Sequence, residues 1–467
     1  MATTAQSAFR ALVLFGCTLG GAALLPAQVQ DASAPKVTPA GQDRAGIPQL
    51  ATFVEHHGIT WRFAAEVEVG AFVNGDPWVI GPVTIISIEP RCVELEGRIL
   101  HGSMVDPDPT TMKQGYDSCL FGDEHRERYA PEQNVAFGLD AEHALKLAGP
   151  TNLVSVRSRL DRKLLPQLQT AAVLTVLKEA PAPDAFRPPY VRGDKTMPHR
   201  AADLDFTVLR REKPVSTVPP IEVVAAAFER VWLDHFPEWP VRYAHPADNM
   251  PDYGREIAAL VGTGGLLLNL EATNEQKRQL LVRMTQLGID LYGVLRGGGR
   301  WPGLGGHGSG RKFPILLAGL VLHDESMLGI GAKYRSERRS AAAGEQFFAE
   351  DGQTFYVRET STGVYNWGFG GYTKEHADLP EWGFNHASQL DTDRAGWDDN
   401  PYRRCCSANG WVGQALAARM LGLQAHWAHP AFFDYMDRYM QVQHTEGWHR
   451  AWTGWHASMW DAYRSNF

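Results

Sequence analysis

The sequence predicts a β-sandwich-like region followed by an α/α toroid, complete or incomplete. Short segments rich in β-branched or alternating apolar residues fill residues 55–212. Across residues 213–467, apolar residues instead recur at helical spacing. Glycine-rich links separate the helical segments, most clearly GGGRWPGLGGHGSGR at residues 297–311, as expected for helical hairpins joined by loops. An irregular helical bundle is the alternative to the toroid.

The β region contains several short predicted strands. The turn signal Asn74-Gly75-Asp76-Pro77 separates the first two of them. Frequent turns between short strands are typical of a sandwich, and a proline-rich strap at residues 179–200 then leads to the helical half. The strands are expected at residues 64–69, 78–88, 92–99, 153–158 and 170–177.

The helical half contains six predicted helices. Asn274, followed by Glu275, is expected to cap the third helix, and Asp252 is expected to cap the second. The helices are expected at residues 221–236, 253–270, 274–295, 312–322, 412–421 and 431–443.

The N-terminus, residues 1–28, is typical of an export signal. Arg10 precedes an apolar run, and a site near Ala27 suits signal peptidase. Residues 29–54 are rich in Ala, Pro, Gln and Asp, which predicts a disordered spacer. We therefore expect a secreted or periplasmic protein without a membrane-spanning helix. A lipid anchor at Cys17 is the less favoured alternative.

Composition limits the classes of partner. The 467 residues are 44% hydrophobic, enough for large cores and two domains. The net charge of −8, without long blocks of charge, argues against nucleic acid. Fourteen Trp and fourteen Tyr residues suit a carbohydrate ligand, because sugar CH faces stack on aromatic rings, although the same residues also pack cores.

The segment EWGFNHASQLDTDRAGWDDNPYRRCCSANGW, residues 381–411, carries the most informative chemistry. Gly, Trp, Asp and Pro predict that most of it is loop. An amide, an imidazole, a phenol and guanidinium groups can neutralise a sugar carboxylate and move a proton from the carbon beside it. A loop that only closes the fold is the alternative. The chemical groups belong to Asn385, His386, Tyr402, Arg403 and Arg404.

Further candidate binding residues lie on neighbouring loops. His245 and Asn249 precede a predicted helix, and they are expected to face a cleft. The glycine-rich loop adds Trp301, His307 and Arg311, and its glycines allow close approach to a ligand. The loop lacks the GxxxxGK[ST] spacing of a phosphate loop. Trp382 is a further candidate for substrate binding.

An exported helical half with Asn-His followed by Tyr and Arg resembles the toroid polysaccharide lyases, including alginate and glycosaminoglycan lyases. The resemblance covers roughly residues 216–467. It implies β-elimination on an anionic polysaccharide that contains uronic acid. It implies that Asn385 neutralises the carboxylate, that His386 is a base or orienting group, and that Tyr402 is the acid or base. Arg404, or Arg403, would hold the carboxylate and lower the pKa of the phenol. Those lyases often carry their β-sandwich after the toroid, whereas the β region comes first here.

A second resemblance rests on the cysteines. Cys405-Cys406 followed by Asn409 resembles a toroid arabinofuranosidase family in which vicinal cysteines bind zinc and one is the nucleophile. Thiols or a metal role are open for this pair. Because the helical half has no third cysteine, we favour buried thiols and expect neither zinc nor another cofactor. Outside the cytoplasm, Cys92 and Cys119 are candidates for a disulfide.

Two other readings of the helical half stay open. The first is hydrolysis by a pair of carboxylates; its candidates are Asp248, Asp252, Asp391, Asp398 and Asp399. The second is a non-catalytic glycan-binding protein that uses exposed tryptophans as stacking platforms; its candidates are Trp301, Trp367, Trp382 and Trp397.

Overall fold

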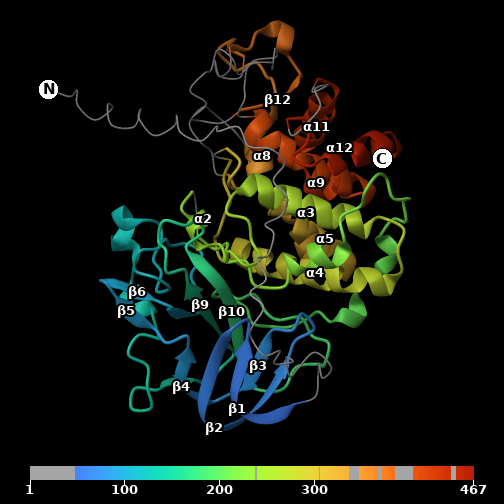
Figure 1. The fold of residues 1–467 in the computed structure, drawn as a ribbon. Helices are drawn as coiled ribbons and strands as arrows, with labels where there is room; N and C mark the ends of the chain where they lie inside the picture. Colours follow the sequence, from blue (N-terminus) through green and yellow to red (C-terminus); the bar gives the residue numbers. More distant parts are fainter. Residues whose placement is uncertain are drawn as a thin grey trace, which may run out of the picture. The chain divides into compact units, whose positions relative to one another are not determined.

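The computed structural model confirms a mostly-strand region followed by a helical region (Figure 1). It describes residues 48–236, 239–303, 305–335, 346–365, 371–383, 403–442 and 449–467. Residues 43–467 form one compact unit. The finer predictions of a sandwich and a toroid stay predictions, and the export signal at residues 1–28 lies outside the described residues. Within the described residues, no helix combines the length and the apolar character needed to cross a membrane.

Eight strands form one curled sheet in the order β7-β9-β10-β3-β2-β4-β8, with β1 paired to β2. Neighbouring strands are antiparallel except for β10 and β3, which are parallel. A separate hairpin is formed by β5 (Val93–Leu95) and β6 (Arg98–Leu100). The strands of the sheet are β1 (Gln49–His56), β2 (Ile59–Ala71), β3 (Pro77–Ile80), β4 (Val83–Glu89), β7 (Ser103–Val105), β8 (Leu145–Leu147), β9 (Thr151–Ser158) and β10 (Leu168–Leu177).

Three strand predictions need correction. The predicted spacer ends earlier than expected, because β1 already begins at Gln49. The predicted strand 78–88 is two strands, separated at Gly81-Pro82, where proline supplies no backbone donor. The predicted strand 92–99 is the β5–β6 hairpin, because Glu96 and Gly97 turn the chain with positive φ angles of 51° and 73°.

Strand β10 links the two regions, because its two faces belong to different cores. Ala172 and Leu174 pack with Trp61 in the core of the sheet. Val173 between them packs into the large core that the helices share. Alternate side chains of a strand point to opposite faces, so the helical region covers one face of this strand. This double burial explains why β10 is buried almost throughout.

The helical region is built around two closely packed helix pairs, α3 with α9 and α4 with α5. Small residues permit the close approach. A Cβ at Gly262 of α3 would lie 2.6 Å from the backbone nitrogen of Gln414 in α9. The longer helices are α3 (Gly254–Leu268), α4 (Asn274–Arg296), α5 (Lys312–Leu322), α9 (Ala408–Met420), α11 (Pro430–Val442) and α12 (Gly454–Tyr463). The shorter elements are α1 (Ile221–Ala226), α2 (Val241–Ala244), α6 (Glu325–Leu328), α7 (Ile330–Lys333), α8 (Ala349–Gln353), α10 (Gln424–Trp427), β11 (Thr354–Tyr356) and β12 (Pro380–Trp382).

The helix termini correct three predictions. The predicted helix 221–236 ends at Ala226, and residues 227–236 continue as turns and irregular chain that bury Trp232 and Leu233. Thr273, not Asn274, caps α4, because its hydroxyl accepts from the backbone nitrogen of Gln276 at 3.2 Å. Asp252 does not cap α3; it forms an ion pair with Arg242 instead.

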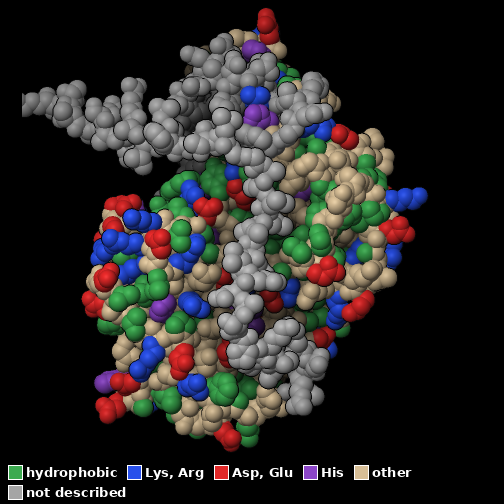
Figure 2. Space-filling model, viewed as in Figure 1, with side chains coloured by type: hydrophobic (Ala, Val, Ile, Leu, Met, Phe, Trp, Pro, Cys, Tyr) green, Lys and Arg blue, Asp and Glu red, His purple; other side chains and the backbone are tan. Residues whose placement is uncertain are grey.

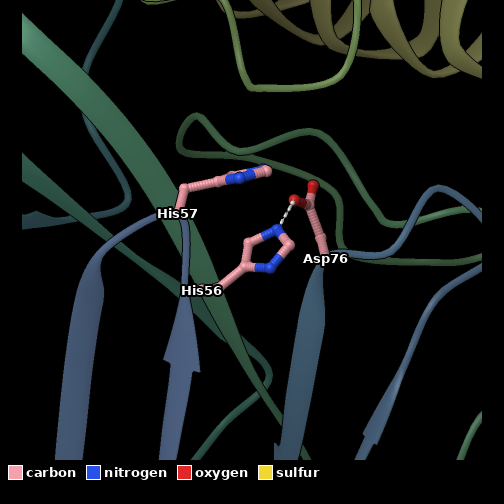
Figure 3. A group of neighbouring side chains, drawn as sticks. All are labelled: His56, His57 and Asp76. Atoms are coloured by element: carbon pink, nitrogen blue, oxygen red, sulfur yellow. Dashed lines mark hydrogen bonds and ion pairs between the residues drawn. The ribbon is translucent and has the colours of Figure 1, made fainter. Parts of the chain in front are cut away.

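The strap at residues 179–200 joins the two regions through one buried arginine. Arg187 Nε donates to Asp76 Oδ2 at 2.6 Å, and its Nη2 donates to Asp290 Oδ2 of α4 at 2.5 Å. His56 and His57 lie beside the same Asp76 (Figure 3). On the outside, acidic and basic side chains are interspersed over the described surface in view (Figure 2).

Candidate functional site

Three of the predicted binding residues, His245, Trp301 and Arg311, meet at Asp234. Arg311 Nε donates to Asp234 Oδ2 at 2.5 Å, and its Nη2 donates to Oδ1 at 3.0 Å. His245 Nε2 lies 3.4 Å from the same Oδ1. Trp301 Nε1 donates to the Asp234 carbonyl at 3.1 Å. We call these four residues the Asp234 cluster; each is at most 3% exposed.

In the Asp234 cluster, the negative charge of Asp234 is stabilised by Arg311 and His245. Burial alone raises the pKa of Asp234, but the Arg311 guanidinium and the His245 hydrogen bond outweigh burial and hold the pKa well below its usual range. His235, next in the chain, is also fully buried, and burial lowers the pKa of its imidazole to about 3. The cluster therefore contacts protein groups in this conformation, and direct contact with a ligand stays a prediction.

Asn249 and the two acidic residues of its loop are likewise engaged with protein. The Asn249 amide donates to the carbonyls of Ala227 and Arg230, each at 3.2 Å, and so fixes the chain after α1. Asp248 accepts a hydrogen bond from Gln169, and Asp252 is paired with Arg242. These contacts position the loop that precedes α3.

Arg403 and Trp382 lie together around Glu381. Arg403 Nη1 is 3.5 Å from Glu381 Oε2, and its guanidinium lies 5.5 Å from the centre of the Trp382 ring. Arg438 also pairs with Glu381, and Tyr372 donates to this carboxylate at 2.8 Å. Trp382 and Arg403 are both fully buried, so neither presents an open face in this conformation.

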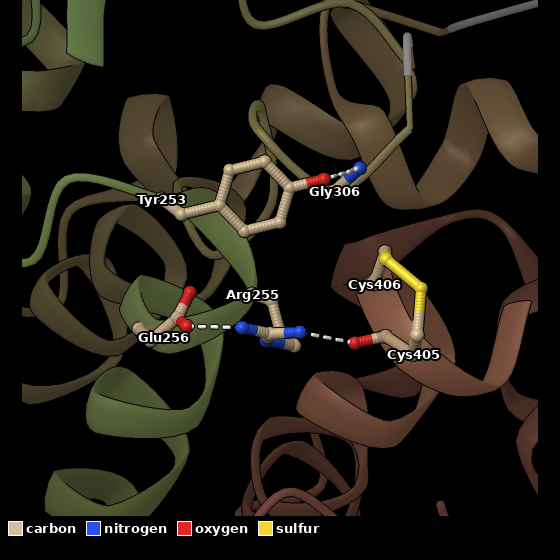
Figure 4. Close-up of a disulfide and its surroundings, with 6 residues drawn as sticks. All are labelled: Tyr253, Arg255, Glu256, Gly306, Cys405 and Cys406. Atoms are coloured by element: carbon tan, nitrogen blue, oxygen red, sulfur yellow. Dashed lines mark hydrogen bonds and ion pairs between the residues drawn. A yellow bond between two sulfur atoms is a disulfide. The ribbon is translucent and has the colours of Figure 1, made fainter. Parts of the chain in front are cut away.

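The vicinal cysteines form a disulfide at the start of α9 (Figure 4). The favoured prediction of two thiols is therefore wrong. The pair lies in a π-helical turn, Arg403–Ser407, which directly precedes α9. The predicted pairing of Cys92 with Cys119 is also wrong, since both are free thiols. Cys92 instead accepts a hydrogen bond from the Asn134 amide at 3.3 Å.

Arg255, in the first turn of α3, joins this turn to its surroundings. Its Nη1 donates to the Cys405 carbonyl, and its Nη2 donates to Glu256 (Figure 4). The guanidinium lies 3.7 Å from the centre of the Trp452 ring and 5.6 Å from that of Tyr253. A cation is unfavourable at a helix N-terminus, so Arg255 is held there by these aromatic and carbonyl contacts.

Glycines let three segments meet at this point. The Gly306 nitrogen donates to the Tyr253 hydroxyl at 3.3 Å. A Cβ at Gly306 would lie 1.8 Å from the Cys406 carbonyl oxygen, and a Cβ at Gly254 would lie 2.1 Å from the Gly306 carbonyl oxygen. The glycine-rich loop is thus needed for backbone contact between α3, the loop and the disulfide turn. His307 follows Gly306, and its buried ring packs edge-on against Trp239 at 5.8 Å.

Arg404 differs from the other predicted arginines. It is partly exposed, and its Nε is buried without a hydrogen-bond partner. In the described part of the chain, no hydrogen bond or ion pair engages its guanidinium. The positive charge of Arg404 acts on His449, whose pKa is lowered by burial and by this charge. We call Arg404, Arg255, Tyr253, Trp452 and the Cys405–Cys406 disulfide the Arg404 surface.

The remaining predicted residues fall outside the described residues. They are Asn385, His386 and Tyr402, together with Trp367, Trp397, Asp391, Asp398 and Asp399 of the alternatives. The structure adds Trp452 and His449, which the sequence did not single out. It also gives contacts to Tyr253 and Arg255, which belong to the same conspicuous segment as His245 and Asn249 but had no predicted role. The sequence could have pointed to Arg255, because a cation in the first turn of a predicted helix is unfavourable unless nearby groups stabilise it.

A hollow of about 850 Å³ lies in the β region and reaches the loop that carries Asp248, one candidate of the carboxylate alternative. Its lining is polar and charged, and includes Glu89, His101, Arg157, Arg159, Gln169 and Asp248.

Comparison of the chain with protein-family models, curated proteins and solved structures finds no match. Any functional assignment therefore depends on the chemistry of the residues themselves.

Proposed function

We propose that the protein is an exported polysaccharide lyase that binds a uronate-containing chain at the Arg404 surface and cleaves it by β-elimination. The observation that carries the proposal is the Arg404 guanidinium, which is partly buried and engages no described partner. A guanidinium presents a planar fork of donors that matches a carboxylate. Arg255 of the neighbouring α3 adds a second guanidinium, which lies over the Trp452 ring, donates to the Cys405 carbonyl and pairs with Glu256.

The chemistry needs a neutralised carboxylate and a proton shuttle. Neutralising the uronate carboxylate makes the hydrogen on the adjacent carbon more acidic. A base removes this proton, a carbon–carbon double bond forms, and the bond to the glycosidic oxygen breaks. The departing oxygen receives a proton from an acid. In the proposal Arg404 and Asn385 hold the carboxylate, Tyr402 moves the proton, and His386 orients or assists.

The proposal also includes the predicted architecture, a β-sandwich-like region followed by an α/α toroid, and a secreted or periplasmic location. The packed pair α4–α5, two consecutive helices joined by the glycine-rich loop, supports a toroid, because toroids are built of such helical hairpins. The zinc-dependent hydrolase is less favoured, because both sulfurs of Cys405 and Cys406 are bonded to each other and offer no thiolate. A glycan-binding protein without catalysis uses the same surface and is separated from the lyase by experiment.

The test is ultraviolet detection of the unsaturated product across a panel of uronate polymers, with neutral polysaccharides as controls. The lyase proposal expects product from at least one acidic polymer and from none of the neutral ones. Tyr402→Phe should abolish turnover and leave glycan affinity within about threefold, because only the proton-bearing hydroxyl is removed. Binding by the wild type without product would identify a glycan-binding protein. Equal losses of binding and turnover in Tyr402→Phe would remove its shuttle role.

A further inference from the structure

A second group of side chains with ligand chemistry lies far from Arg404 in sequence, where the β1–β2 turn approaches the start of β3 (Figure 3). His56, His57 and Asp76 each offer one donor atom, and the three atoms lie within 4.8 Å of one another. His56 Nε2 is 3.2 Å from Asp76 Oδ1. The His57 ring lies over the His56 ring, with centres 3.8 Å apart. Among the described residues, these two histidines and one aspartate form a group whose spacing suits a metal ion.

We propose that His56, His57 and Asp76 bind a divalent transition-metal ion of the zinc class. Two imidazole nitrogens and one carboxylate oxygen are a common ligand set for such ions, with further positions left for water. Bonds of about 2.0–2.2 Å in a tetrahedral site place neighbouring donor atoms about 3.3–3.5 Å apart. The His56–Asp76 separation already fits this geometry, and the proposal requires the His57 nitrogen, within 4.8 Å of the other two donor atoms, to move inward on binding.

His57 supplies the observation that an ordinary His–Asp pair does not explain. Its Nε2 is buried and has no hydrogen-bond partner in the described part of the chain. A buried polar nitrogen normally has a partner, and an ion would provide one. Burial, reinforced by His56 and Arg230, lowers the pKa of His57 to about 2. Burial thus favours the neutral imidazole, whose lone pair can bind a metal ion.

Asp76 is oriented by contacts behind the proposed ion. Its Oδ2 accepts from Arg187 at 2.6 Å and from the Asn74 amide at 2.8 Å, which leaves Oδ1 directed at His56. Such outer contacts fix ligand carboxylates in known metal sites. The charge of Arg187 is balanced by Asp290, which lies 2.5 Å from it.

Arg283, whose charge also acts on His57, is likewise paired: it lies 3.1 Å from Glu229. Arg230 is 4.0 Å from Asp248. The neighbouring positive charges are thus offset by carboxylates, and Asp76 stays ionised because Arg187 and His56 outweigh burial and lower its pKa. The proposed ion would tie the β1–β2 turn to Asp76, which Arg187 already connects to α4. Metal binding should therefore raise stability as well as fill the site.

The experiment titrates chelator-treated, full-length protein with Co²⁺, whose visible absorption reports tetrahedral coordination, and then competes with Zn²⁺. The wild type is expected to bind one Co²⁺ per chain at this site and to melt at a higher temperature with Zn²⁺. His57→Asn removes the imidazole at a residue whose φ of 52° asparagine tolerates, and it should lose the absorption band. His56→Gln should lose the band as well, which covers the case of a misfolded first variant.

His143→Asn is the matched control. His143 lies 3.1 Å from Asp140, so it is also a His–Asp pair, but it is exposed and, among the described residues, it belongs to no three-residue group with metal-binding spacing. This variant should keep the Co²⁺ band and the stabilisation by Zn²⁺. The proposal is overturned if the wild type shows no tetrahedral Co²⁺ band, or if folded His57→Asn and His56→Gln retain it. Because the readout is a spectrum and a melting temperature, failure of the lyase proposal leaves this test intact.

Discussion

The Asp234 cluster and the Arg404 surface contain similar side chains in opposite electrostatic situations. Arg311 is fully buried, and its donors meet the Asp234 carboxylate and two backbone carbonyls. Arg404 is partly exposed and engages no described partner. Both arginines follow loops that the sequence marks as functional. The difference teaches that residue type and loop position do not identify a ligand site; the balance of charges and partners around each group does.

The largest expected effect is a loss of stability on replacing Arg311 in the buried Asp234 cluster. Arg311→Ala leaves the Asp234 carboxylate buried without its guanidinium, and so should lower the free energy of unfolding by about 3–5 kcal/mol. Urea unfolding followed by circular dichroism measures it. Arg91→Ala, at an exposed arginine in the β region, is the control and should change stability by less than about 0.5 kcal/mol. A loss from Arg311→Ala as small as that of the control would refute the scaffold role.

The next effect disturbs the packing beneath the Arg404 surface. Gly306→Ala places a methyl group against the Cys406 carbonyl oxygen, so the loop and the disulfide turn must separate. We expect a loss of stability of about 1–3 kcal/mol, together with reduced turnover. Gly371→Ala is a control for glycine replacement, since it has no atom within 4 Å of the added methyl group, although its φ of 67° carries its own strain. Comparable turnover in the two variants would show that the contact at Gly306 does not shape the site.

Replacement of Arg404 should have the opposite consequences to replacement of Arg311: little change in stability and a loss of ligand affinity. Arg404→Ala removes no described ion pair, so the unfolding free energy should change by less than about 0.5 kcal/mol. Affinity for an acidic oligosaccharide should fall at least tenfold, in line with about 1.5–3 kcal/mol for a hydrogen bond to a charged group. Isothermal titration calorimetry measures the affinity, with Arg91→Ala again as control. Unchanged affinity would place the carboxylate-binding group elsewhere.

A smaller effect concerns pH. The pKa of His235 is lowered to about 3 by burial, so between its ordinary value of 6.5 and about 3 the unfolded chain binds a proton that the folded chain does not. Stability is therefore lost as pH falls through this window, by about 1.4 kcal/mol per pH unit for each such histidine. His57 and His456 act in the same direction, with pKa values lowered to about 2 and about 3. His235→Gln should reduce the slope of unfolding free energy against pH by one proton, and an unchanged slope would contradict this assignment.

The smallest effect is expected at the disulfide. Arg255 contacts Cys405 through its backbone carbonyl, and this contact does not need the sulfur atoms. The double variant Cys405→Ala, Cys406→Ala should therefore keep turnover within about threefold of wild type if it folds, as circular dichroism would check. A folded double variant without turnover, from a wild type that carries stoichiometric zinc lost in the variant, would favour the cysteine–zinc hydrolase instead.

Helices and strands were predicted best where a continuous run of apolar residues marks the element. The helix over Lys312–Leu322 was predicted to the residue, because its apolar run is continuous and glycines precede it. The split of the strand at Gly81-Pro82 and the shift of a helix cap from Asn274 to Thr273 depended on single backbone groups. For the site, the sequence identified conspicuous residue types. It did not show that Asp234 engages Arg311 and His245, since Arg311 lies 77 residues after Asp234 in the chain.

The account's central claim, carboxylate-dependent elimination, is tested most directly by one measurement. The initial rate of unsaturated-product formation is compared on an acidic uronate polymer and on the same polymer after chemical reduction of its carboxyl groups. The account predicts product from the acidic polymer and none from the reduced one, because only a neutralised carboxylate makes the adjacent carbon acidic. Equal cleavage of both polymers, or cleavage of the acidic polymer without an unsaturated product, would contradict it.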